Sequence, residues 1–272
     1  MKRLLILAAL TLTACEPQPA GEPVVRTELG DPVAAPEAVP DEPVEVAANP
    51  DSACQSAEFE GVSLTHCIAD PELHTIRTSL APSSGDNFGT IEGWAAGKNE
   101  SAIAFVMNAG AFGDDLKPIG YYVENGDRLA ELNRSDGDSN FFLKPNGVFF
   151  GTGGSWRIIE TDTFLRTIGT RPAFGTQSGP MLVIGGKLHP EVQDDGPSKA
   201  IRSGVGVASD GKAHFVIANA PLSYGKLARF FRDELKTPNA LFLDSGNSSL
   251  WDPASARMDG GRVGPLIVVE KK

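Results

Sequence analysis

Four short segments of this chain place polar side chains beside glycine at the ends of apolar runs. They are Asn108–Phe112, Gln177–Pro180, Arg202–Gly206 and Asp244–Ser249. Glycine adopts left-handed conformations and lets the backbone approach a ligand closely, so such segments are typical of sites at strand ends. Together they would supply two amides, hydroxyls, a guanidinium and a carboxylate. We expect the four segments to form one polar pocket.

Two of these residues carry charge. Asp244 follows four apolar residues and precedes Ser-Gly, which predicts a carboxylate emerging from a buried strand, where neighbours tune its pKa. The alternative is an aspartate that only hydrogen-bonds its own turn. Arg202 offers a planar guanidinium that suits phosphate or carboxylate, or else it is a surface arginine near Lys199.

Several enzyme classes are excluded by missing residues. Asp244-Ser-Gly is similar to the aspartic protease loop, but no second Asp-Ser-Gly or Asp-Thr-Gly exists to share the proton. Gly175–Ser178 lacks the glycine of a serine-hydrolase nucleophile elbow. Asp136–Asn140 begins like a calcium loop, yet Phe141 and Gly147 stand where an EF-hand needs glycine and glutamate. A looser calcium site stays open, and otherwise we predict neither metal nor cofactor.

The elements expected to position these residues are mostly strands. One amphipathic helix is predicted from Tyr224 to Leu235. Hairpin turns are predicted at Glu124–Asp127, Pro145–Gly147, Ile184–Gly186 and Ser209–Gly211. The expected strands are 102–107, Phe141–Leu143, Val148–Phe150, Met181–Ile184, Gly204–Ala208, His214–Ala218, Ala240–Leu243 and Gly264–Val269. This pattern predicts an α+β fold, a strand-rich mixed or antiparallel sheet with few helices in a single domain.

The N-terminus reads as a bacterial lipoprotein signal. Residues 1–14 combine Lys2 and Arg3 with a short apolar run, and the segment closes on Cys15, which we expect to be lipidated. Residues 15–50 are acidic and proline-rich, which predicts a disordered tether to a domain at 51–272. The protein is thus expected in the cell envelope, anchored to a membrane by lipid and facing the periplasm or the exterior.

Charge and cysteine use fit that compartment. The chain carries a net charge of −11 without a cluster of lysine and arginine, so nucleic acid is excluded as a partner. Cys54 and Cys67 remain as an even pair, and we predict that they form a disulfide stapling the N-terminal strand. A metal pair is the weaker alternative, since the histidines lack ligand spacing.

The order of the motifs resembles the bacterial branch of the phosphodiester glycosidase family, which is related to the mammalian uncovering enzyme, N-acetylglucosamine-1-phosphodiester α-N-acetylglucosaminidase. The resemblance spans roughly Val62 to Val269, with one departure, Ser245 in place of the family's glycine. It rests on Asn108–Phe112, Pro118–Gly120, Asn140–Val148, Gln177–Leu182, Gly186–Pro190, Ile201–Gly206, Ala228–Asp233 and Asn239–Asp244.

The resemblance implies hydrolysis of a sugar-1-phosphodiester at the anomeric carbon, with N-acetylglucosamine-type compounds as the example that the related enzyme offers. A phosphate ester leaves easily, so a carboxylate and stabilisation of phosphate charge matter most. We assign Asp244 as base or nucleophile, and Arg202, with Lys144, to the phosphate. His189 would assist proton transfer, unless it is only a turn residue.

The remaining candidate residues would bind the sugar or supply a second carboxylate. The predicted substrate contacts are Asn108, Gly110, Gln177, Ser178, Gly179, Ser203, Gly204, Gly246 and Ser248; the second carboxylate would be Asp114, Glu131 or Asp138. The rival hypotheses are a non-catalytic lipoprotein that binds envelope glycan or exopolysaccharide, and a structural envelope protein whose site has degenerated, as Ser245 would suggest.

Overall fold

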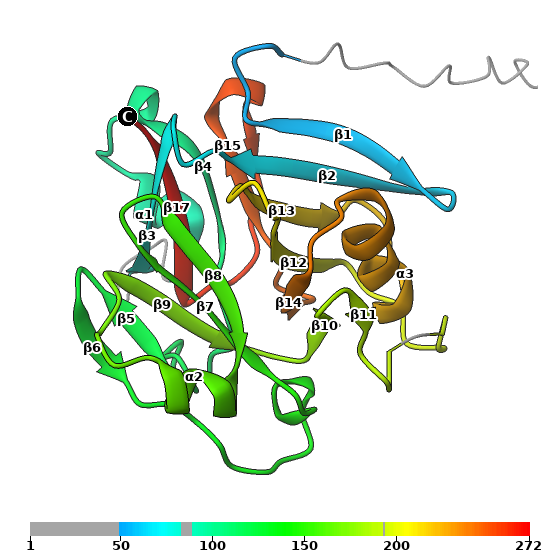
Figure 1. The fold of residues 1–272 in the computed structure, drawn as a ribbon. Helices are drawn as coiled ribbons and strands as arrows, with labels where there is room; N and C mark the ends of the chain where they lie inside the picture. The colour runs from blue at the N-terminus through cyan, green and yellow to red at the C-terminus, as the bar shows by residue number, and fades with distance from the viewer. Residues whose placement is uncertain (1–48, 83–88, 193) are drawn as a thin grey trace, which may run out of the picture. The chain divides into compact units, whose positions relative to one another are not determined.

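The computed structural model describes residues 49–82, 89–192 and 194–272, and these described residues belong to one compact unit (Figure 1). The predicted signal peptide, the lipidated Cys15 and nearly all of the predicted tether lie outside the described residues. Within the described residues, every helix is too short or too polar to span a bilayer.

The largest layer is a seven-stranded sheet that carries two of the four polar segments. Two neighbouring inner strands are β12 and β14 (Figure 1). Strand β12 contains the Arg202–Gly206 segment, and the Asp244–Ser249 segment begins at the end of β14. In spatial order the strands are β1 (Cys54–Phe59), β2 (Val62–Ala69), β13 (Ala213–Ala218), β12 (Arg202–Val207), β14 (Asn239–Ser245), β10 (Met181–Ile184) and β11 (Lys187–Leu188).

Two five-stranded sheets complete the domain. The first comprises β16 (Arg257–Met258), β15 (Leu250–Asp252), β4 (Ile103–Asn108), β17 (Pro265–Lys271) and β3 (His74–Leu80). The second comprises β6 (Asp127–Ala130), β5 (Tyr122–Glu124), β9 (Phe174–Ser178), β7 (Gly147–Thr152) and β8 (Ser155–Glu160). Phe105, Phe149 and Phe215 contribute one ring from each sheet, and their edge-to-face contacts join the sheets in one core.

Every strand pairing in the described part of the chain is antiparallel, and its helices are short. The predicted α+β, strand-rich, single-domain fold is therefore confirmed. The helices are α1 (Ile91–Ala95), α2 (Thr161–Thr167), α3 (Tyr224–Arg229) with its π-helical continuation η3 (Phe230–Glu234), and the 3-10 turns η1 (Glu100–Ala102), η2 (Asn140–Phe142) and η4 (Pro253–Ser255).

The helix α3–η3 packs on the seven-stranded sheet and explains one glycine motif. The Ser223 hydroxyl caps α3 by accepting a hydrogen bond from the Lys226 amide. Phe231 of η3 lies against β12, where a Cβ on Gly204 would come within 2.9 Å of its ring and one on Gly206 within 2.8 Å. The two glycines of Arg202–Gly206 therefore make room for an aromatic ring.

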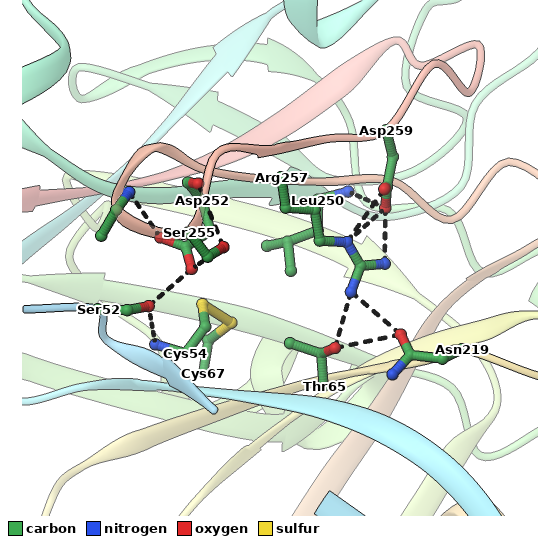
Figure 2. Close-up of a disulfide and its surroundings, with 11 residues drawn as sticks. Ser52, Cys54, Thr65, Cys67, Asn219, Leu250, Asp252, Ser255, Arg257 and Asp259 are labelled. Carbon is green, nitrogen blue, oxygen red and sulfur yellow. Dashed lines mark hydrogen bonds and ion pairs between the residues drawn. A yellow bond between two sulfur atoms is a disulfide. The ribbon is translucent and has the colours of Figure 1, made fainter. Parts of the chain in front are cut away.

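The N-terminal hairpin is cross-linked as predicted. Cys54 of β1 and Cys67 of β2 are directly paired and form a disulfide, which confirms that prediction (Figure 2). Next to it the buried Asp252 accepts hydrogen bonds from the hydroxyls of Ser52 and Ser255. These bonds join the start of β1 to the end of β15 and so hold the first strand of the domain in place.

One predicted hairpin is wrong. Phe141–Leu143 was expected as a strand that turns at Pro145–Gly147, but the chain forms the 3-10 turn η2 there. The buried Asn146 amide donates to the Phe141 carbonyl at 2.8 Å and closes a loop between η2 and β7. A buried ring at Phe141 and a side-chain hydrogen bond thus replace strand pairing.

Candidate active site

Asp244 lies at the end of β14 and lines a pocket of about 230 Å³. The pocket is also lined by the loop after β4 and by the segment before β17, and its residues are Ala111, Phe112, Gly113, Asp114, Asp244, Asn247 and Arg262. Two of the four polar segments, Asn108–Phe112 and Asp244–Ser249, therefore meet at one pocket.

The Asp244 carboxyl is only half satisfied by the protein. Its Oδ1 accepts a hydrogen bond from the Ser245 amide at 2.6 Å, while Oδ2 is buried and has no hydrogen-bond partner among the described residues. Burial raises the pKa of Asp244 to about 6. Gly246 follows with φ at +83°, a conformation that glycine adopts without strain. A carboxyl of this kind can exchange a proton near neutral pH.

A hydrogen-bond network fixes the Asp244 turn from behind. The Asn108 Oδ1 accepts from the Ser249 amide at 3.0 Å, and its Nδ2 donates to the Ser203 hydroxyl at 3.0 Å. The Ser248 hydroxyl donates to the Asp244 carbonyl at 3.0 Å and lies 3.1 Å from the Ser203 hydroxyl. The structure thus brings Asn108, Ser203 and Ser248 together with Asp244, but their polar atoms bind one another.

The Gln177 amide makes all four of its hydrogen bonds within the protein. Its Oε1 accepts from the amides of Tyr121 and Asn133, each at 2.9 Å. Its Nε2 donates to the Asn133 carbonyl at 2.7 Å and to the Thr161 hydroxyl at 3.2 Å. The side chain is buried and has no remaining capacity for a sugar hydroxyl.

The neighbouring residues of that segment also make their contacts within the protein. The buried Ser178 hydroxyl donates to the Leu243 carbonyl at 3.1 Å. A Cβ on Gly179 would lie 2.6 Å from the Phe141 carbonyl oxygen, and one on Gly110 only 2.1 Å from the Gln177 carbonyl oxygen. These glycines allow close contact between segments of the protein's own main chain.

Arg202 is a buried cation that pairs with no carboxylate of the described residues. Its Nε donates to the Leu222 carbonyl at 3.0 Å, and its Nη2 to the Ser198 carbonyl and hydroxyl at 3.1 and 3.0 Å. The guanidinium carbon lies 3.6 Å from the centroid of the Tyr224 ring. None of the ion pairs between described residues includes Arg202. Arg202 faces Ser245 across the β12–β14 pair, beside Asp244.

Lys144 and His189 lie together in a different place. Lys144 forms an ion pair with Asp136 and lines a separate pocket of about 260 Å³ with Arg134 and Glu160. His189 is fully buried, with Nε2 3.1 Å from the Lys144 carbonyl and Nδ1 accepting from the Glu191 amide. Burial lowers the pKa of His189, so its imidazole is neutral. Neither side chain lines the Asp244 pocket.

The sequence patterns did not single out Arg262, and they included Asn247 only as part of the Asp244–Ser249 segment. Arg262 lines the Asp244 pocket, and its Nη2 donates to the Asp114 carbonyl at 3.1 Å. The signal was present, because Asp259-Gly-Gly-Arg262 is a further polar segment with glycine beside a strand. The Leu266–Asn108 pairing of β17 with β4 brings Arg262 to the site.

Of the three candidates for a second carboxylate, Asp114 shares the pocket with Asp244. Glu131 instead forms an ion pair with Arg128 and lines another pocket, and Asp138 is exposed on a loop. Among the described residues no group of three or more histidine, cysteine, aspartate or glutamate side chains is arranged to hold a metal ion. Asp136 of the calcium-like segment is engaged by Lys144.

The chain belongs to the phosphodiester glycosidase family, whose model matches residues 101–262. That range contains Asp114, Arg202, Asp244 and Arg262. The chain is 29% identical over 195 residues to the uncharacterized protein YigE of Escherichia coli strain K12. The aligned residues cover 71% of this chain and 74% of YigE.

A solved structure shares the fold. The catalytic domain of zebrafish N-acetylglucosamine-1-phosphodiester α-N-acetylglucosaminidase, auto-inhibited by its pro-peptide, superposes with a TM-score of 0.54 at 14% identity over 80% of this chain and 82% of that one. A hypothetical protein from Synechocystis gives a TM-score of 0.49 at 16% identity, covering 80% of this chain and 61% of its own.

Proposed function

We propose that this protein is a glycosidase-type hydrolase that cleaves the bond between the anomeric carbon of a sugar and the oxygen of a phosphodiester. The observation that carries the proposal is the desolvated Asp244 carboxyl, with a pKa of about 6 and an unpartnered oxygen, at a polar pocket inside the family match. Such a carboxyl is poised for proton transfer near neutral pH.

In the proposed reaction Asp244 is the general base. Its carboxylate takes a proton from a water molecule whose oxygen bonds to the anomeric carbon. The bond from that carbon to the phosphodiester oxygen breaks, and the electron pair leaves with the phosphate monoester. Because phosphate is a good leaving group, its departure needs charge stabilisation more than protonation. Arg262, a cation that lines the same pocket, is positioned to provide it.

The substrate class and the compartment belong to the same proposal. The zebrafish protein with this fold is named for action on an N-acetylglucosamine-1-phosphodiester, which makes such compounds the first substrates to try. The lipoprotein signal and the acidic segment after it favour a substrate of the cell envelope or an exopolysaccharide.

The test is turnover by the purified full chain. It is incubated with UDP-N-acetylglucosamine and a panel of synthetic sugar-1-phosphodiesters, with and without calcium, and free sugar is read by mass spectrometry. We expect the wild type to release free sugar. The rate of release should fall on the order of a thousandfold in Asp244→Asn, and kcat/KM should fall about tenfold or more in Arg262→Gln.

The exposed Asp138 provides the matched control, since Asp138→Asn removes the same charge from a loop away from the pocket. It should keep wild-type turnover. Saturable sugar binding without any product would instead support the non-catalytic glycan-binding hypothesis. Turnover that survives in Asp244→Asn would sink the assignment of the base.

A further inference from the structure

Two buried side-chain atoms of the described residues lack a hydrogen-bond partner, and they belong to neighbouring parts of the molecule. They are Asp244 Oδ2 and the hydroxyl oxygen of Tyr224. Buried polar atoms in proteins are almost always satisfied, so an unpartnered group needs an explanation. Arg202 connects the two, because its guanidinium stacks on the Tyr224 ring and its strand position faces Ser245, next to Asp244.

The Tyr224 ring is held firmly even though its hydroxyl is not bonded. Tyr224 is the first residue of α3, directly after the Ser223 cap. One contact is with Arg202, and another is with Phe242 of β14, at 4.8 Å between ring centroids. Contacts from β12 and β14 therefore fix where the hydroxyl lies. A group that is positioned but unbonded is typical of a binding site.

The protonation state of Tyr224 makes it a donor. Burial raises the pKa of the Tyr224 hydroxyl, the neighbouring Arg202 and Ser245 side chains lower it, and the Asp244 charge raises it by the smallest amount. None of these described neighbours makes a hydrogen bond to the hydroxyl oxygen. The hydroxyl therefore stays neutral and carries its proton. The ring also packs on Phe242, two residues before Asp244 in β14, so the two unpartnered groups come from adjoining parts of the molecule.

We propose that the Tyr224 hydroxyl donates a hydrogen bond to the phosphodiester of the substrate bound at Asp244. This inference rests on the proposed function and adds a substrate-contacting residue to it. Ionised Asp244 can only accept hydrogen bonds, so the site needs a separate donor. The Arg202 guanidinium stacked on the ring places a positive charge close to the hydroxyl, which favours an anionic acceptor over a sugar hydroxyl.

The test compares Tyr224→Phe with Tyr121→Phe in the full chain. Tyr121 is the matched control, a buried tyrosine whose ring packs on Phe164 beside another pocket. With a sugar-1-phosphodiester that the wild type cleaves, we expect Tyr224→Phe to lower kcat/KM by roughly 10- to 100-fold, as for loss of a hydrogen bond to a charged group, and Tyr121→Phe to stay within twofold of wild type.

Stability separates a substrate contact from a structural bond. Because the hydroxyl has no partner, Tyr224→Phe should unfold at the same or a higher urea concentration than the wild type. A lower midpoint would reveal a structural hydrogen bond and overturn the inference. Turnover within twofold of wild type would also overturn it, while leaving the proposed hydrolysis intact.

If the wild type cleaves no diester, the proposed function is refuted. A binding measurement then tests the Tyr224 contact by itself. Calorimetric titration with N-acetylglucosamine 1-phosphate and with inorganic phosphate then replaces the turnover assay. Affinity at least tenfold weaker in Tyr224→Phe than in wild type supports the Tyr224 contact for a phosphate-binding protein. Equal affinity, or no binding by the wild type, overturns it.

Discussion

Gln177 and Asp244 are both polar residues at the ends of buried strands, yet the protein treats them in opposite ways. The Gln177 amide makes four hydrogen bonds to main chain and side chain. The Asp244 carboxyl has one bonded oxygen and one buried, unpartnered oxygen. The difference separates a group that holds the fold together from a group left open for chemistry, although both follow the same pattern in the sequence.

The largest effect on stability should come from removing the satisfied group. Gln177→Leu keeps the size of the side chain but leaves the Tyr121 amide and three further polar groups without their partner. We expect a loss of about 3–5 kcal/mol in the free energy of unfolding, since each unmet buried group costs about 1–3 kcal/mol. Urea unfolding followed by circular dichroism measures the loss.

Gln55→Leu is the control for Gln177→Leu, because Gln55 is an exposed glutamine on β1. It should change the free energy of unfolding by less than about 0.5 kcal/mol. If Gln177→Leu were as mild as this control, the four hydrogen bonds would not hold the loops around β9 in place, and the contrast with Asp244 would fail.

Asp244→Asn should raise the free energy of unfolding, whereas Gln177→Leu lowers it. The folded-state pKa of about 6 exceeds the ordinary value of 3.8, so the folded protein holds this proton more tightly than the unfolded chain does. The resulting stability is complete below about pH 4 and is lost as the pH rises through about 6. Above that pH the variant, whose amide is neutral, should be more stable by up to about 3 kcal/mol.

Urea unfolding of the wild type and Asp244→Asn between pH 4 and pH 8 checks this prediction. The gap between the two midpoints should widen as the pH rises and level off above about 6. Asp138→Asn, at an exposed site, should show no such gap. A constant gap across the range would mean that burial does not shift the Asp244 proton equilibrium.

The packing of η3 on β12 gives a smaller effect. A methyl group on Gly204 would approach Phe231 to 2.9 Å and the Leu241 carbonyl oxygen to 3.1 Å. We expect Gly204→Ala to lower the free energy of unfolding by about 1–3 kcal/mol, as overpacking does. Gly196→Ala is the control, since nothing lies within 4 Å of its Cβ position. Equal midpoints for the two variants would show that the ring shifts freely.

Much of the fold could be predicted from the sequence because its strands are short apolar runs bounded by turn residues. Met181–Ile184 is found where expected, and Asn125 and Gly126 have the positive φ that their hairpin requires. The strand predicted at Phe141–Leu143 is wrong because a side-chain hydrogen bond from Asn146 replaces strand pairing, and no periodicity in the sequence reveals that bond.

The site was predictable only where a local sequence signal marks the residue. An apolar run delivering Asp244 is a local signal, and it led to the residue at the pocket. Arg262 reaches that pocket only because β17 pairs with β4 across a large sequence separation. Nor does the sequence tell a satisfied amide from an open carboxyl, because the partners of Gln177 come from distant segments, among them Tyr121 and Thr161.

The pH dependence of turnover sharpens the comparison at the level of chemistry. If Asp244 acts as the base, kcat/KM should fall about tenfold per pH unit below its pKa of about 6 and reach a plateau above it. Asp138→Asn should keep the same profile, since that carboxyl lies outside the pocket. A rate that falls as the pH rises through 6 would assign the protonated carboxyl as a general acid, and a water activated elsewhere would then have to attack. Asp114, the other carboxylate that lines the pocket, would be the residue to change next.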